Sequence, residues 1–389
     1  MPGKLLLTCT QCGRPFFNEG EKAYYDKHHL YPPKRCKDCR KIKKERSDRL
    51  KKEAEDRAGQ ERKEKESARI LSSMPYQKYS LAELPLDHSR RTLYIIGNGF
   101  DLMHGVPSRY TEFRDYLGKH SELRKQLEDW NLKEDLWSDL EDSLAHMDDE
   151  RMMGTVPDMM DIMGVPEEDD DDFLAADFFA AAEWAVYPLQ VIEAELPKRF
   201  RKWIESLRPV STAKPLVSVI NNNGYYINFN YTEFLESVYG VPSENVLYIH
   251  GDRRKKKQEL ILGHASGAEE DPEYHKKEWK PRFHNQTSYD MHMTAGRHVA
   301  EYYDITTKRS DMIIENNRER FEALSDIKVI VVIGHSLSYV DYPYFKEIKQ
   351  KTGRAVWNLG WHNPSDLKRI RAFVNVIGIG KEQIVLFRT

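Results

Sequence analysis

The sequence has no hydrophobic run long enough to cross a membrane, and it has no cysteine after residue 39. A membrane-spanning helix needs about 18 or more consecutive apolar residues, and the apolar segment near the N-terminus is also shorter than a signal peptide requires. We therefore expect a cytoplasmic protein with no membrane partner. A large net charge is missing too, since 60 basic residues oppose 63 acidic ones. No chain-wide field favours nucleic acid.

The chain of 389 residues, 40% of them hydrophobic, has room for two domains. Its composition changes twice along the sequence. We expect a small cysteine-bearing domain over 1–45, a charged helical linker over 46–90 and a large domain over 91–389.

Short apolar runs recur throughout the large domain. They are expected to form strands at 92–97, 225–230, 246–251, 328–337, 354–361 and 383–388. These runs lack the alternation of a half-exposed strand, which is typical of parallel strands covered on both faces. The predicted fold class is α/β, with a parallel Rossmann-like sheet, helices on both faces and a helical insertion at about 108–222.

The four cysteines form two pairs with the spacing of a zinc site: Cys9 and Cys12, then Cys36 and Cys39. Two such pairs that converge on one ion give a closed tetrahedral site with a structural role. A redox-active CxxC motif is the alternative, but it belongs to a thioredoxin-like βα unit that this segment lacks. The segment resembles a family of small bacterial zinc ribbons of unassigned function.

Basic and aromatic residues surround the cysteines, among them Arg14, Lys34, Arg35, Tyr24 and Tyr25. Such residues bind nucleic acid through phosphate contacts and base stacking. The alternative is that the aromatics fill a small core and the charges are solvated. A nucleic acid or a phage or defence protein therefore stays an open partner for this segment.

The stretch YIIGNGFD places Gly97 and Gly99 directly after an apolar strand. Glycines at such a turn let the backbone approach a ligand and turn N–H groups toward a phosphate. The dinucleotide fingerprint G-x-G-x-x-G is absent, because Leu102 occupies the third glycine position. A simple strand-to-loop turn is the alternative.

Three further strand ends carry polar groups. They are Asn228 and Asn230, then His250 and Gly251, then Gly334, His335 and Ser336. Because ligands of α/β sheets bind at the carboxyl ends of the strands, we expect a single polar crevice there.

The order G-N-G-F-D, F-N-Y-T-E, I-H-G and G-H-S-L-S-x-V-D resembles the AbiH family of bacterial abortive-infection proteins and, more broadly, the sirtuin-like NAD-binding fold. The resemblance covers about residues 91–389 and implies NAD as the substrate in the crevice. It implies cofactor-binding positions at Gly97, Asn98, Gly99, Phe100, Asp101, Gly334, His335 and Ser336, and the strand-end residues Asn228 and Gly251 are expected to bind the cofactor with them. Asn98, Asp101, Thr232 and His335 depart from the usual sirtuin-like residues, and the cysteines lie outside the sheet domain, so protein deacetylation is not expected.

Hydrolysis of the nicotinamide–ribose bond needs a neutral-pH base and a stabilised oxocarbenium-like transition state. His250 is expected to be the base, Asn230 to hold the water or ribose, and Asp101 to face the developing positive charge. Tyr339, Asp341 and Tyr344 are interpreted as packing and capping groups. The predicted function is an anti-phage effector that hydrolyses NAD as a homo-oligomer. The alternative is a nucleotide-sensing or nucleic-acid-binding defence module without NAD turnover.

Overall fold

The computed structural model describes residues 6–86, 91–166, 171–172, 174–209, 214–265 and 286–389. The chain forms two compact units, Met1–Ser73 and Met74–Thr389. Within the described residues, no helix has both the length and the apolar character that crossing a bilayer requires.

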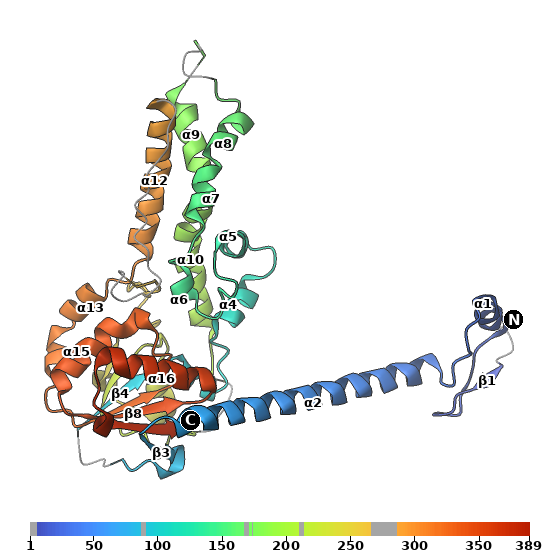
Figure 1. The fold of residues 1–389 in the computed structure, drawn as a ribbon, viewed down its shortest axis with the longest axis horizontal. Helices are drawn as coiled ribbons and strands as arrows, with labels where there is room; N and C mark the ends of the chain where they lie inside the picture. Colours follow the sequence, from blue (N-terminus) through green and yellow to red (C-terminus); the bar gives the residue numbers. More distant parts are fainter. Residues whose placement is uncertain (1–5, 87–90, 167–170, 173, 210–213, 266–285) are drawn as a thin grey trace. The chain divides into compact units, whose positions relative to one another are not determined.

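The first unit joins a cysteine-bearing module to one long helix (Figure 1). Strands β1 (Leu7–Thr8) and β2 (Pro15–Phe16) pair antiparallel, and helices α1 (Glu19–Lys27) and α2 (Lys37–Ser72) follow. Nearly all of α2 is exposed, and ion pairs between residues four apart, such as Arg49 with Glu53, support it. Helix α2 is therefore stabilised along its own surface and not by a buried apolar face.

The second unit is built on a parallel sheet of seven strands. They are β3 (Gln77–Ser80), β4 (Thr92–Ile96), β5 (Tyr225–Asn228), β6 (Val246–Tyr248), β7 (Val329–Ile333), β8 (Val356–Trp361) and β9 (Ile384–Arg388). Their spatial order is β3-β9-β8-β7-β4-β5-β6. Every neighbouring pair runs parallel.

This order confirms the predicted α/β class and gives it a Rossmann topology. Strands β4 to β9 follow the doubly wound order 3-2-1-4-5-6. Strands β5 and β6 are added on one side of β4, and strands β7, β8 and β9 are added on its other side, so the switch point lies between β4 and β7. All residues of β4 and β7 are buried, as their unbroken apolar sequences predict. The switch between β4 and β7 is where such a sheet opens a ligand crevice.

The seventh strand, β3, was not expected. It lies within the segment 46–90, where a charged linker was expected, yet it pairs in parallel with β9 at the edge of the sheet. Its sequence, QKYS, is mostly exposed, and therefore it lacks the apolar signal of the central strands.

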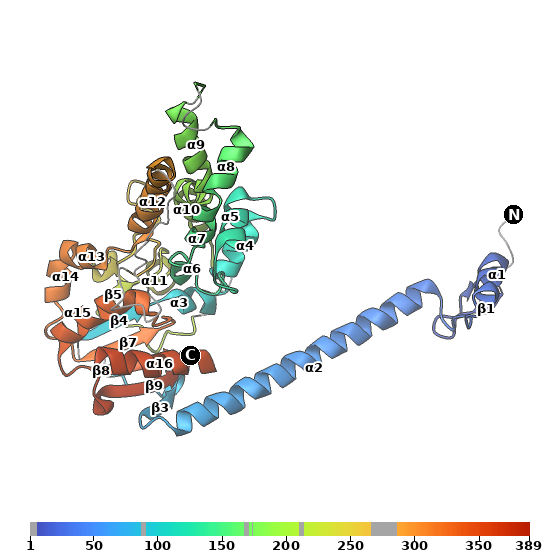
Figure 2. The same ribbon diagram turned by 45° about the horizontal axis from the view of Figure 1, so that its top comes forward.

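Helices cover both faces of the sheet. On one face Phe345 of α15 (Tyr342–Thr352) and Phe373 of α16 (Pro364–Ile377) pack on Trp357 of β8, with ring centroids 6.4 and 6.1 Å away. Figure 2 shows these two helices side by side against the sheet. On the other face Tyr94 and Tyr226 share a core with α10 (Tyr187–Ser206) and α11 (Phe234–Tyr239).

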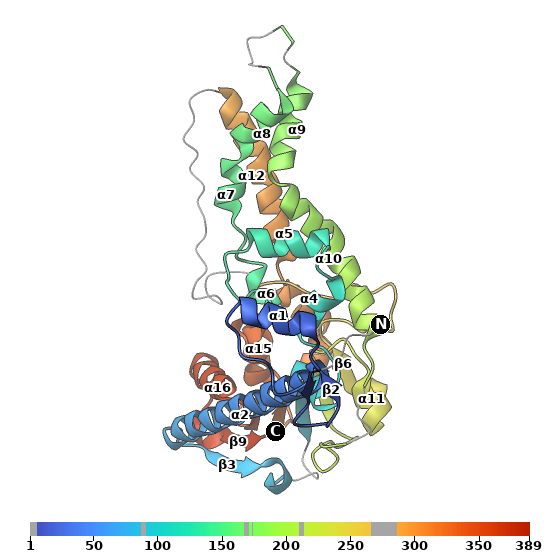
Figure 3. The same ribbon diagram turned by 90° about the vertical axis from the view of Figure 1, so that its right-hand side faces the viewer.

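Helix α3 (Asn98–Met103) follows β4 directly, and the helices of the insertion predicted at about 108–222 come after it. They are α4 (Tyr110–Leu117), α5 (Glu122–Trp130), α6 (Leu140–Ser143), α7 (Asp149–Gly154), α8 (Val156–Met163), α9 (Ala175–Ala185) and α10. Helix α12 (Gln286–Thr306), which comes much later in the chain, lies beside α9 and α10 (Figure 3). The helical layer therefore draws on two distant parts of the sequence. Short helices α13 (Ser310–Asn316) and α14 (Arg318–Glu322) then lead into β7.

Candidate functional site

A cavity of about 660 Å³ opens at the carboxyl ends of β4, β5 and β7, the switch point of the sheet. This volume lies within the range of small-molecule sites in proteins. Nine of the residues expected at the site line the cavity: Gly97, Asn98, Gly99, Asp101, Asn230, His250, Gly334, His335 and Ser336. The insertion supplies the opposite wall, with Tyr110, Trp137, Asp139, Glu141 and Trp203. Four segments that are distant in sequence therefore meet at one cavity.

The remaining three expected residues lie behind the cavity wall. Phe100 is buried in the core against His104, with ring centroids 4.6 Å apart. Asn228 accepts a hydrogen bond from the backbone N–H of Asn230 and donates one to the Thr232 carbonyl, which shapes the turn after β5. Gly251 has a φ of 100°, and a Cβ there would lie 2.7 Å from the Glu259 carbonyl oxygen. These three residues shape the backbone around the cavity.

The glycine turn after β4 and the glycine turn after β7 are joined by hydrogen bonds at the switch point. The N–H of Gly97 donates to the Ile333 carbonyl at 3.0 Å, and the N–H of Gly99 donates to the Gly334 carbonyl at 2.7 Å. The expectation that these two N–H groups face a phosphate is therefore wrong. The glycines serve close packing instead, because a Cβ on Gly97 would lie 2.5 Å from the Cα of His335.

Gly334→Ala is expected to lower the free energy of unfolding of the second unit by about 3 kcal/mol, because it combines a left-handed backbone with overpacking. Gly334 has a φ of 64°, and an added Cβ would lie 2.3 Å from the Phe100 nitrogen. Urea unfolding followed by tryptophan fluorescence measures this loss, since all seven tryptophans lie in the second unit.

Gly378→Ala is the matched control for this substitution. Gly378 has a similar φ of 71° with nothing within 4 Å of an added Cβ, so only the backbone cost of about 1 kcal/mol is expected there. Equal losses in the two variants would show that the turns do not interlock as described.

Asn98 braces the loop that follows the glycine turn. Its Nδ2 donates to the Ser108 carbonyl at 2.7 Å, and its Oδ1 accepts from the Ser108 hydroxyl at 2.5 Å. The side chain therefore fixes the loop between residues 98 and 108 while its surface borders the cavity.

Asp101 and Asn230 form a buried pair at the cavity floor. Asn230 Nδ2 donates to Asp101 Oδ1 at 2.9 Å and to the Gly97 carbonyl at 3.1 Å, and the Thr232 hydroxyl donates to Asp101 Oδ2 at 2.7 Å. Burial raises the pKa of Asp101 to about 7, although the hydrogen bonds from Thr232 and Asn230 oppose that shift. Asp101 is therefore a carboxyl group that changes its charge near neutral pH.

His250 reaches the cavity from the turn after β6 and is 3% exposed. Its Nε2 atom is buried without a hydrogen-bond partner and lies 3.6 Å from Asp341 Oδ1. Burial, followed by the charge of Lys308, lowers the pKa of His250 to about 3, although Asp341 raises it. The imidazole is thus neutral at physiological pH, as a proton acceptor must be.

His335 lies beside the same carboxylate. Its Nδ1 accepts the backbone N–H of Leu337 at 2.9 Å, so the proton of the neutral ring belongs on Nε2. That Nε2 lies 3.4 Å from Asp341 Oδ2. Burial lowers the pKa of His335 to about 4.

A charged cluster beside the two histidines was not predicted from the sequence, although two of its three members line the cavity. The Lys308 ammonium is fully buried and lies 3.1 Å from both Asp341 Oδ1 and Glu141 Oε2. Asp341, interpreted from sequence as a packing or capping residue, contacts both histidines and this lysine. The motif that ends in Asp341 carried the one sequence signal available, since Lys308 and Glu141 belong to segments that read as ordinary charged surface.

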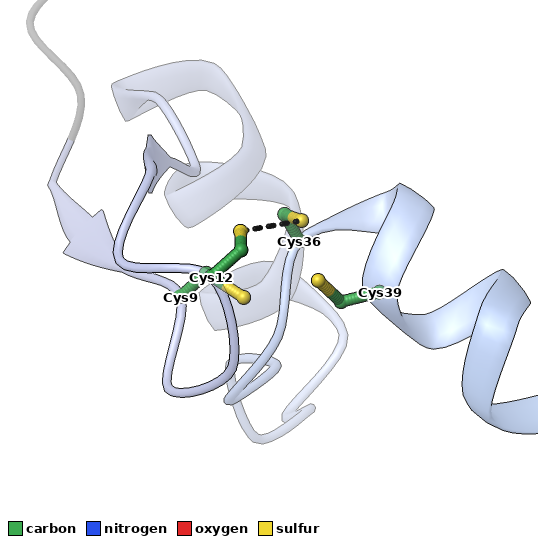
Figure 4. Close-up of side chains that lie close together, drawn as sticks. All are labelled: Cys9, Cys12, Cys36 and Cys39. Atoms are coloured by element: carbon green, nitrogen blue, oxygen red, sulfur yellow. Dashed lines mark hydrogen bonds between the residues drawn. The ribbon is translucent and has the colours of Figure 1, made fainter.

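The four cysteines of the first unit converge on one point (Figure 4). Their sulfur atoms all lie within 4.8 Å of one another, and Cys12 Sγ is 3.7 Å from Cys36 Sγ. Thiolates bound to one zinc ion at ~2.3 Å stand roughly 3.8 Å apart in a tetrahedron, so the arrangement fits the ion. Burial raises the pKa of Cys39 to about 12, whereas backbone hydrogen bonds lower the pKa of Cys9 to about 6 against the effect of burial. A cation is therefore needed to keep all four sulfur atoms as thiolates.

The two cysteine pairs sit on different elements. Cys9 and Cys12 lie in the turn between β1 and β2, whereas Cys36 caps α2 and Cys39 lies in its first turn. One pair on a hairpin and one at a helix start is a more specific arrangement than the expected ribbon. Thr10 links the two halves, because its N–H and hydroxyl both donate to the Lys34 carbonyl at 3.0 Å.

Together, fold and site define an α/β protein with a Rossmann-type ligand cavity and a separate four-cysteine module. Residues 93–361, most of the chain, match the model of the family described as "Bacteriophage abortive infection AbiH", and the chain therefore belongs to this family. Residues 5–48 match a family described as "Probable treble clef domain", in agreement with the position of the cysteine pairs. No curated protein and no solved structure matches the chain. Family membership implies a role in abortive infection of bacteriophage.

Proposed function

We propose that this protein is a cytoplasmic anti-phage effector that binds NAD in the switch-point cavity and hydrolyses its nicotinamide–ribose bond. The observation that carries the proposal is the buried Nε2 of His250, which has no hydrogen-bond partner and lines the same cavity as Asp101 and Asn230. A buried polar atom without a partner is costly, and a ligand or water in the cavity relieves that cost.

The leaving group needs little assistance from the protein. Nicotinamide departs from a cationic ring with the electron pair of the C1′–N1 bond and becomes neutral, so no strong acid is needed. A water molecule then bonds to C1′, and its proton passes to His250 Nε2. The ionised carboxylate of Asp101 stabilises the positive charge that develops on the ribose.

Asn230 holds Asp101 through its amide nitrogen, and that contact orients the carboxylate. Because the pKa of Asp101 is about 7, ionisation of this group favours turnover at pH 8 over turnover at pH 6. Turnover is expected to rise with pH because only the charged carboxylate of Asp101 stabilises a cationic transition state.

Full-length protein incubated with NAD is expected to release nicotinamide, and His250→Ala is expected to slow the release by roughly 10²–10⁴-fold, the usual contribution of a general base. Asn230→Ala is expected to slow it as well, because Asp101 loses a hydrogen bond and its orientation. Chromatographic measurement of nicotinamide at pH 6 and pH 8 checks both statements.

His120→Ala is the control, since His120 is exposed and does not line the cavity. Equal release by wild type, His250→Ala and Asn230→Ala would remove both residues from the mechanism. Absence of release from the wild type in every oligomeric state, the expected homo-oligomer included, would reject the hydrolase.

A nucleotide sensor without turnover is the second candidate. It is favoured by the low pKa of His250, about 3, which makes the ring a weak base, and by the mutual hydrogen bond of Asp101 and Asn230. Calorimetric binding of NAD that leaves the nicotinamide bond intact would support the sensor over the hydrolase.

The treble clef module offers a separate surface for a nucleic-acid partner. Lys37, Arg40, Lys41 and Lys44 are exposed and share one face of the first two turns of α2. Such a row suits a phosphate backbone, and affinity that falls steeply with salt is its signature. A salt-insensitive affinity for a phage or defence protein would favour the protein partner instead.

A further inference from the structure

Asp341 lines the cavity together with the two histidines, and it forms an ion pair with Lys308. The Asp341 carboxylate lies 3.6 Å from His250 Nε2 through Oδ1 and 3.4 Å from His335 Nε2 through Oδ2. The Lys308 ammonium, 3.1 Å from Oδ1, lowers the pKa of Asp341 and keeps it ionised in a buried place.

His250 Nε2 and Asp341 Oδ1 are two acceptors that face each other. A hydrogen bond between His250 and the backbone of Phe229 raises the pKa of the imidazole. A ring N–H that donates to a carbonyl has this effect, so the proton of the neutral ring lies on the nitrogen opposite Nε2. With no proton between them, a lone pair and a carboxylate 3.6 Å apart repel each other. A proton that arrives on His250 Nε2 turns this repulsion into an ion pair.

We propose that Asp341 is the positioning residue that enables His250 to accept a proton. Lys308 pairs with both Asp341 and Glu141, and it therefore connects Asp341 to the helical insertion. The proposal rests on the proposed NAD hydrolysis for its catalytic part. In the step, the C1′–N1 bond breaks with its electrons on nicotinamide, the water oxygen bonds to C1′, and the water proton goes to His250 Nε2. Asp341 takes no proton; it stabilises the imidazolium.

The groups that face His250 come from several elements. They are Asp341 and Tyr344 after β7, Lys308 after α12, His335 at the end of β7, and Tyr231 after β5. Asp341 raises the pKa of His250, whereas Lys308 and His335 lower it. Asp341 is thus the group in this set whose charge favours the protonated ring.

Glu141, which also lines the cavity, gives the test a matched comparison. It faces the same ammonium at the same 3.1 Å from the insertion side, and no ion pair joins it to either histidine in the described part of the chain. In Asp341→Asn, Glu141 remains as the counterion of Lys308, and in Glu141→Gln, Asp341 remains. Both variants therefore keep a paired lysine, and folding is expected in both.

The experiment compares full-length wild type, Asp341→Asn and Glu141→Gln in two measurements. Steady-state NAD hydrolysis is expected to show a kcat for Asp341→Asn that is roughly 10²–10⁴-fold below wild type with little change in KM, and at least about tenfold below that of Glu141→Gln. Histidine-selective ¹⁵N NMR, with His250→Gln and His335→Gln for assignment, is expected to show both ring signals displaced in Asp341→Asn and less displaced in Glu141→Gln.

The two measurements separate the failures. If the wild type releases no nicotinamide, the proposed function fails, and the NMR arm alone decides whether Asp341 holds the histidines. Unmoved ring signals in Asp341→Asn overturn the proposal whether or not NAD is cleaved. Equal kcat values for the two variants also overturn it, because they would show that the carboxylates act only as counterions of Lys308.

Discussion

Removal of zinc is expected to unfold the cysteine module of the first unit while the sheet of the second unit stays folded. The module buries few apolar side chains besides its cysteines, so the metal supplies its folding energy, typically about 10–16 kcal/mol for small structural sites at neutral pH. Elemental analysis should find one zinc ion per chain, and none after dialysis against a strong chelator. Tryptophan fluorescence, which reports on the second unit alone, should remain unchanged.

Cys36→Ser is expected to have the same effect without a chelator, since it removes one ligand of the closed site. Thr10→Ser is a conservative control in the same turn, because serine keeps a hydroxyl for the Lys34 carbonyl. Metal-free protein whose cysteine module keeps its amide dispersion in NMR spectra would contradict the assignment.

Lys308→Met is expected to cost the second unit roughly 3–5 kcal/mol, the usual penalty when one partner of a buried ion pair is removed. The Lys308 side chain is fully buried, and methionine leaves the Asp341 carboxylate, which is only 5% exposed, without a cation. Urea unfolding monitored by tryptophan fluorescence measures the loss.

The double variant Lys308→Met with Asp341→Asn is the control, and it is expected to recover more than half of that loss. With both charges gone, Glu141 is the remaining carboxyl group, and burial raises its pKa to about 7, so it is readily neutralised. A double variant as unstable as Lys308→Met alone would indicate that lost packing, and not an unpaired charge, causes the effect.

The main strands were predictable because their apolar runs are unbroken. Val329–Ile333 and Thr92–Ile96 carry a buried side chain at every position, a pattern that few other structures produce. Gln77–Ser80 was missed because this edge strand is mostly exposed and carries no apolar run. Its pairing with β9 depends on the tertiary fold, which the local sequence does not indicate. The helical layer was predicted only between β4 and β5, because nothing in 286–306 indicates that it packs on helices far earlier in the chain.

The cavity was predictable from the rule that parallel strands present their carboxyl ends at one edge. His250, Asn230 and Gly334 follow strands, and for this reason they meet there. Lys308 has no such marker, because a lysine in TTKRS looks like surface until the fold buries it against two acids. The role of the glycines was misjudged for a similar reason, since only the partner loop shows where their N–H groups point.

The interlocked turns at Gly97 and Gly334 have a consequence for affinity. In proteins with the glycine fingerprint, open amides grip the pyrophosphate and supply much of the attraction for a dinucleotide. Here the N–H groups of Gly97 and Gly99 already donate hydrogen bonds to carbonyls at the end of β7 and in the turn after it. The sugar and base ends of a ligand therefore carry more of the recognition, and nicotinamide riboside, which has no phosphate, should compete with NAD better at this cavity than at a fingerprint site.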